Sequence, residues 1–137
     1  LNPSVTYNII DHPYISALQY IYISAVLKSD QEINILKYGD KPRKGYINLI
    51  SLNNLSGSDL NSDAFISTFA LTESSEYSLK FVLNNSFFHS KNILIAYQSA
   101  NPSVPYGPMY ANIISSKLNL RKIPISPHRS SDYYLMR

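Results

Sequence analysis

The segment EYSLKFVLNNSFFHSKNILIAYQ, residues 76–98, places two apolar runs on either side of a polar bend. In the first run, apolar and polar side chains alternate over residues 77–84, with Val82 as the exception, which is typical of a half-buried strand. The second run, residues 92–98, is apolar on both faces, as in a strand through the middle of a sheet. The bend of about nine residues is too short for a parallel crossover, so the segment predicts an antiparallel hairpin.

The same alternation recurs along the chain and predicts an all-β fold. Residues 20–28, YIYISAVLK, favour a strand because they are rich in β-branched and aromatic side chains. The alternative is a helix, since Leu18, Ile21, Tyr22 and Ala25 have helical spacing. Turn-forming clusters separate the segments at a spacing typical of sandwiches and barrels. We therefore expect a single antiparallel β-sandwich of about seven or eight strands, with a small β-barrel as the alternative. The other expected strands are 32–38, 45–52, 64–71, 109–114 and 117–123.

The length of 137 residues fits one domain, so residues 1–137 are expected to form a single sandwich. Residues 1–14 contain two prolines and are interpreted as an extended arm or tether, with an ordinary first strand as the alternative. Residues 117–137 form a basic C-terminal segment. The longest apolar stretch, residues 15–27, is shorter than the ~20 residues that a membrane-spanning helix needs.

Charge is distributed unevenly along the chain. Residues 1–76 carry five basic and eight acidic side chains, whereas residues 77–137 carry seven basic and one acidic, giving net charges of −3 and +6. The basic end is suited to an acidic partner, a polyanion or an anionic surface. The alternative is a solvated face that balances the acidic first half. With 45% apolar residues the chain is expected to fold, and the absence of cysteine excludes disulfides and thiolate chemistry.

No motif in the sequence indicates catalysis or identifies a known family. The glycines of GDKPRKGY, residues 39–46, lack the spacing of a phosphate-binding loop. The three histidines, His12, His89 and His128, are far apart and have no ligand spacing. The acidic residues are scattered, and no serine lies in a nucleophile elbow. We therefore expect a chain that is not an enzyme, with no cofactor and no metal.

The two adjacent phenylalanines in the bend leave two interpretations open. Phe87 and Phe88 either plug the end of the core or protrude as a contact anchor beside His89 and Lys91. A second loop, NPSVPYGPMY at 101–110, is stiffened by three prolines. The expected partner contacts come from these two loops and the basic segment: Phe87, Phe88, His89, Lys91, Tyr106, Met109, Arg121, Lys122 and Arg129.

These features favour a binding or assembly role through protein–protein contacts. The expected setting is an exported periplasmic, cell-surface or extracellular domain, held at the cell envelope by a segment upstream of Leu1. A carbohydrate-binding sandwich is the first alternative, because tyrosines can stack on sugars, although tryptophan is absent. A binder of polyanions or single-stranded nucleic acid is the third reading, and nucleic acid is disfavoured because no RNA-recognition signature is present.

Overall fold

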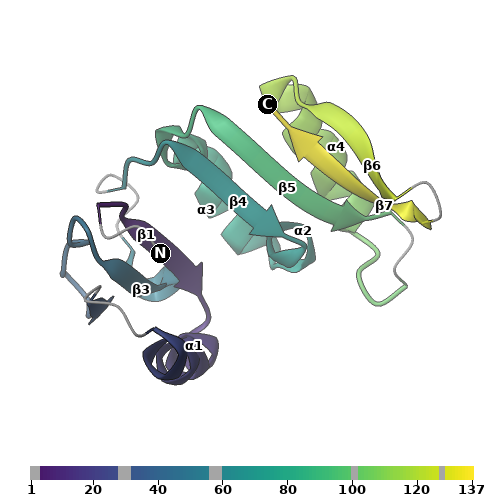
Figure 1. Ribbon diagram of the computed structural model, residues 1–137. Helices are drawn as coiled ribbons and strands as arrows, with labels where there is room; N and C mark the ends of the chain where they lie inside the picture. Colours follow the sequence, from purple (N-terminus) through teal and green to yellow (C-terminus); the bar gives the residue numbers. More distant parts are fainter. Residues whose placement is uncertain (1–3, 28–31, 56–59, 100–101, 127–128) are drawn as a thin grey trace. The chain divides into compact units, whose positions relative to one another are not determined.

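The computed structural model describes residues 4–27, 32–55, 60–99, 102–126 and 129–137 (Figure 1). The chain divides into two compact units, residues 1–60 and residues 61–137. Each unit combines helices with parallel strands, in a three-stranded and a four-stranded sheet. The expected all-β sandwich is therefore wrong, and so is the β-barrel alternative.

The first unit is built on a parallel sheet with strand order β1-β3-β2. The central strand β3 is buried from Ile47 to Ile50, as expected for a strand covered on both faces. Helix α1 connects β1 to β2 and packs against β3 and β1. The elements are β1 (Tyr7–Asp11), α1 (Pro13–Val26), β2 (Ile33–Ile35), β3 (Ile47–Ser51) and the short helix η1 (Leu52–Asn54).

A ladder of asparagine side chains crosses this sheet at one level of the register. Asn48 of β3 is paired with Asn8 of β1 and with Asn34 of β2. The Asn48 amide donates to Asn8 Oδ1 at 2.9 Å and accepts from Asn34 Nδ2 at 2.9 Å. It also donates to the Arg43 carbonyl at 3.0 Å and accepts from the Arg43 N–H at 2.9 Å. The buried amide is thereby satisfied on both sides, which holds the loop before β3 against the sheet.

The second unit is a mixed sheet with strand order β4-β5-β7-β6. Strands β4 and β5 are parallel and joined through α3, whereas β7 runs antiparallel to β5 and β6. Helices α3 and α4 lie on the same side of the sheet (Figure 1). The elements are β4 (Ala64–Thr68), α2 (Ala70–Glu73), α3 (Glu76–Asn84), the short turn η3 (Ser86–His89), β5 (Asn92–Gln98), α4 (Gly107–Leu118), β6 (Arg121–Ser126) and β7 (Arg129–Met136).

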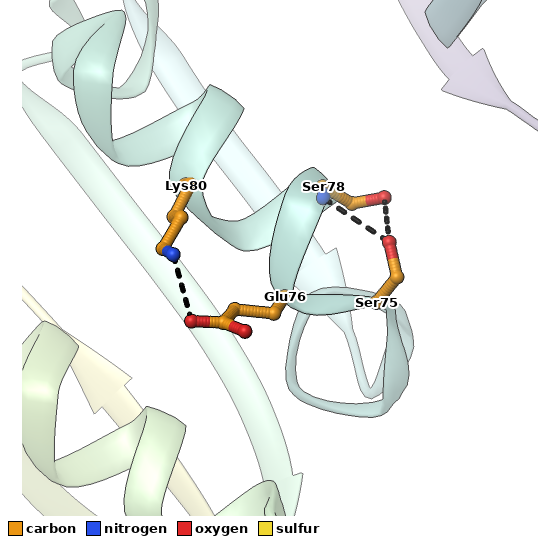
Figure 2. A network of polar contacts seen from close by, with 4 residues as sticks. All are labelled: Ser75, Glu76, Ser78 and Lys80. Carbon is orange, nitrogen blue, oxygen red and sulfur yellow. Dashed lines mark hydrogen bonds and ion pairs between the residues drawn. The ribbon is translucent and has the colours of Figure 1, made fainter.

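The segment that suggested a hairpin is a helix followed by a strand. Ser75 caps helix α3, because its Oγ accepts a hydrogen bond from the Ser78 N–H at 3.2 Å (Figure 2). Glu76 and Lys80 form an ion pair at 2.8 Å, one turn apart on the exposed side (Figure 2). This pair raises the pKa of Lys80, mainly through the hydrogen bond to Glu76. The predicted hairpin is wrong, and β5 pairs in parallel with β4 instead.

Other expectations divide between helices and strands. Residues 20–28 were expected in a strand, but α1 extends to Val26, so the helical alternative is confirmed there. The expected strand at 109–114 is wrong, since it lies within α4. Strands are confirmed within 32–38, 45–52, 64–71 and 92–98, and β5 lies inside its sheet as expected. In the range 117–123 the chain leaves α4 and enters β6. Residues 7–11 form β1, which matches the first-strand alternative for the N-terminal segment.

The bend with the two phenylalanines closes the core of the second unit. Phe87 and Phe88 are 1% and 3% exposed, and both rings contact Phe65 of β4. The backbone reaches this arrangement through four consecutive residues with positive φ, from 50° at Ser86 to 59° at His89. Left-handed backbone costs ~1–2 kcal/mol per residue for side chains with a Cβ. Burial of two aromatic rings offsets this cost, so the plug interpretation holds for both residues.

Candidate functional site

Helix α1 presents most of its large apolar side chains to solvent. It begins after His12, whose Nδ1 accepts a hydrogen bond from the Tyr14 N–H at 3.4 Å. Pro13 occupies the first helical position, where a backbone N–H would have no partner within the helix. The large apolar residues on its surface are 40% exposed or more, with Leu18 at 62% and Ile21 at 65%. Tyr20, 42% exposed, lies on another side of the helix, and we call the remaining set the α1 face: Tyr14, Ile15, Leu18, Ile21, Tyr22 and Val26.

The opposite side of the same helix carries both polar and apolar side chains. Ser16 is buried, and Gln19 and Ile23 are half-buried. Gln19 Nε2 donates to Asp11 Oδ2 at the end of β1, at 3.0 Å. Within the described residues, Ser16 Oγ and Gln19 Oε1 are buried and have no hydrogen-bond partner. The larger apolar stripe of α1 thus faces away from its own unit, whereas a surface helix usually turns that stripe to the core, and we call this arrangement the inversion of α1.

The α1 face is also free of charge. No Asp, Glu, Lys or Arg occurs between Pro13 and Leu27. Charged residues are depleted and tyrosine is enriched at the centres of protein interfaces. A contiguous exposed apolar patch of this kind is typical of an interaction site rather than of an ordinary solvated surface.

A second, smaller apolar stripe lies on α4 and contains two of the expected contact residues. Tyr106 and Met109 are exposed there, together with Ile113 one turn further along. The Tyr106 ring stacks on that of Tyr110, with ring centres 6.4 Å apart, and Tyr110 is buried. The structure therefore brings Tyr106 and Met109 together at the start of a helix, Tyr106 as its N-cap and Met109 in its first turn, although both were expected in a loop.

The expected contact residues of the 84–92 loop divide between buried and exposed positions. Phe87 and Phe88 are buried, which withdraws them as contact residues, whereas their neighbours His89 and Lys91 are exposed. The carbonyl of Lys91 accepts from Arg137 Nε at 3.3 Å, so the end of β7 is fastened to this loop.

Part of the basic segment is engaged with aromatic rings. Lys122 Nζ lies 3.8 Å from the centre of the Tyr133 ring and 5.6 Å from that of Tyr97. Such cation–π contacts stabilise the β6–β7 hairpin locally. Arg121 is exposed on β6, and Arg129 begins β7. The basic residues are thus distributed over a hairpin rather than along a free tail.

The titratable side chains are dispersed over the two units. Among the described residues, no three His, Cys, Asp or Glu side chains are grouped as metal ligands would be. His12 stacks on Tyr14 with ring centres 5.3 Å apart, and His128 lies outside the described residues. In the part of the chain that is described, no helix combines the length and the apolar character needed to span a membrane.

Neither models of known protein families nor curated proteins match this chain. On its exposure and its lack of charge, the α1 face is the site that the geometry supports best. The helical spacing of Leu18, Ile21, Tyr22 and Ala25 is visible in the sequence, although the β-branched and aromatic residues of this segment favour a strand. Pro13 at the start of an apolar run with helical spacing is the signal that could have indicated a helix, whereas its exposure depends on the tertiary structure.

Proposed function

We propose that this chain is a binding or assembly module that acts through protein–protein contacts made by the α1 face. The observation that supports this function is the inversion of α1, in which large apolar residues face outward while Ser16 and Gln19 face inward. An isolated unit would gain stability from the reverse arrangement, because burying one Leu or Ile side chain contributes ~1.5–3 kcal/mol. A partner that covers the face would recover this free energy.

The composition of the face favours a protein over a sugar. Carbohydrate sites need polar groups that orient the hydroxyls, whereas the α1 face has four aliphatic side chains and no charge. Its two tyrosines, Tyr14 and Tyr22, can serve as the aromatic anchors that dominate binding energy at protein interfaces. An exported location remains part of the proposal, and fractionation of cells that produce the tagged full-length protein tests it.

Site-specific photo-crosslinking tests the contact role. A photoreactive amino acid replaces Ile21, and the matched control carries it at Tyr77 on the exposed side of α3. The proposal predicts one discrete adduct from position 21 and none from position 77, identified by mass spectrometry. Adducts of equal yield at both positions, or no adduct at position 21, would contradict it.

A further inference from the structure

We infer that the partner on the α1 face is a second copy of this chain, with the two α1 helices packed antiparallel across a two-fold axis. This inference rests on the proposed contact function and names the partner. It begins from the spacing of Tyr14, Leu18, Ile21 and Ala25, which recur at intervals of four, three and four residues. All four are exposed on α1. Alternating intervals of three and four residues are typical of the seam along which two helices pack with a small crossing angle.

Antiparallel packing fits the sizes of these side chains. A two-fold axis between Leu18 and Ile21 sets Leu18 against the second copy's Ile21, and Tyr14 against the second copy's Ala25. Each large tyrosine then meets a small alanine, and two side chains of equal size meet at the centre. Parallel packing would instead oppose Tyr14 to Tyr14 at one end and Ala25 to Ala25 at the other. The antiparallel pair also places opposite ends of the helix dipoles side by side.

The remaining members of the α1 face flank one side of this seam. Ile15, Tyr22 and Val26 lie clockwise of Leu18 on the helix, at steps of about 100° per residue. In the antiparallel pair Tyr22 lies beside the second copy's Ile15, so that both become covered. The seam and its flank thus account for every residue of the α1 face.

The exposed area is sufficient for a modest dimer. Two tyrosines and four aliphatic side chains at these exposures present roughly 600 Å² per copy. A standard interface contributes about 800 Å² per partner, and smaller ones are transient. We therefore expect a dissociation constant in the micromolar range. A membrane surface is disfavoured as the partner, because interfacial helices carry Lys or Arg on their polar face and α1 has neither.

Sedimentation of the full chain measures the association. The wild type is expected to form a dimer at tens of micromolar, and Leu18→Lys should weaken it about a hundredfold or more, since it places two charges beside the axis. The matched control is Tyr77→Lys, because Tyr77, 69% exposed, and Leu18, 62% exposed, are both apolar residues on the surface of a helix. This control should leave the dimer unchanged, and far-UV circular dichroism checks that both variants fold. A monomeric wild type, or equal weakening by both variants, would overturn the inference.

Crosslinking determines the direction of the helices. The chain has no cysteine, so Tyr14→Cys and Ala25→Cys each introduce a single thiol. A short bismaleimide should join the two variants when they are mixed and join neither variant to itself. In the antiparallel pair the two copies of position 14 are separated by roughly 17 Å along the axis. Self-crosslinking of Tyr14→Cys would overturn the antiparallel arrangement.

The outcomes also separate this inference from the proposed function. A monomeric wild type that still gives a discrete heterologous adduct at position 21 refutes the second copy while leaving the contact role intact. A monomer that binds phosphatidylcholine–phosphatidylglycerol vesicles through Leu18 refutes both. A dimer that dissociates on Leu18→Lys, with an adduct of twice the chain mass at position 21, supports both.

Discussion

Replacing Asn48 with alanine should strongly destabilise the first unit and leave the stability of the second unit unchanged. Asn48 is 0% exposed, and its side chain makes four hydrogen bonds, two to asparagines on neighbouring strands and two to the Arg43 backbone. Each contributes about 1 kcal/mol to the net stability, so their loss costs about 4 kcal/mol. A unit of 60 residues has a total stability of roughly 3–9 kcal/mol. The variant therefore loses much or all of the stability of its first unit.

Amide hydrogen exchange measures this effect for each unit separately. Protection of residues 47–50 in β3 should fall by about three orders of magnitude, whereas residues 93–97 in β5 should keep theirs. Asn53→Ala is the matched control, because Asn53 belongs to the same unit and is exposed. A loss below about 1 kcal/mol would refute the stabilising role of the ladder. An equal loss of protection in β5 would show instead that the two units unfold as one.

The Asn48→Asp variant should have a first unit whose stability depends on pH. One carboxylate oxygen can accept from Asn34 and the Arg43 N–H, but the other faces Asn8 Oδ1 and the Arg43 carbonyl, which are both acceptors. Burial and these acceptors should raise the pKa of this carboxyl in the folded state. A raised pKa of an acid favours the protonated folded form, so the variant should gain stability as pH falls. Urea unfolding at several pH values measures this, and a stability that falls with pH would contradict it.

Three further variants test the second unit. Phe87→Ala should cost about 3–5 kcal/mol in urea unfolding, because it empties the site under Phe65, and a cost below about 1 kcal/mol would rule out the plug. Ser86→Gly should raise stability by up to about 1 kcal/mol, since φ is 50° there, and a lower midpoint would refute left-handed strain at this residue. Glu76→Gln should lower the folded-state pKa of Lys80 toward its ordinary value in an NMR titration, because it removes the charge partner. In the wild type, the stabilisation from this ion pair is complete at pH values below the pKa that Lys80 has in the unfolded chain, and it is lost as pH rises through the pKa of the folded state. An unchanged pKa of Lys80 in the variant would refute the pairing.

Part of the fold could be predicted from the sequence, and the part that could not was decided by competing periodicities. Residues 92–98 are apolar on both faces, and this length and pattern are typical of a buried strand, which is what they form. Residues 76–84 match a strand and a helix almost equally well. The deciding signals were local: Ser75 as an N-cap, Glu76 paired with Lys80, and Val82, which breaks the alternation and is buried in α3. The strand-like alternation over seven residues favoured the wrong prediction, although all three of these signals are features of the helix that forms.

The contact residues were harder to predict, because exposure is a property of the tertiary structure. Phe87 and Phe88 look like an exposed tip in a polar bend, and only a left-handed backbone turns them into the core. A sequence gives little warning of this, since residues other than glycine rarely adopt that conformation. Tyr106 and Met109 were identified as contacts for the stiffness of their loop, and they are exposed because α4 begins there.

The inversion of α1 is the main support for a contact surface on this helix. Had the helix served only its own sheet, leucine at positions 16 and 19 and polar residues at 18 and 21 would have been more stable, by ~1.5–3 kcal/mol for each buried side chain. The chain instead places Ser16 and Gln19 inward, each with a buried oxygen that lacks a partner among the described residues. Ser16→Ala should therefore cost little or even stabilise the first unit, while Leu18→Asn should leave the unit's stability unchanged and weaken association. Were Leu18→Asn instead to destabilise the isolated unit by as much as a core substitution, Leu18 would have to be packed within it, and the α1 face would not be a contact surface.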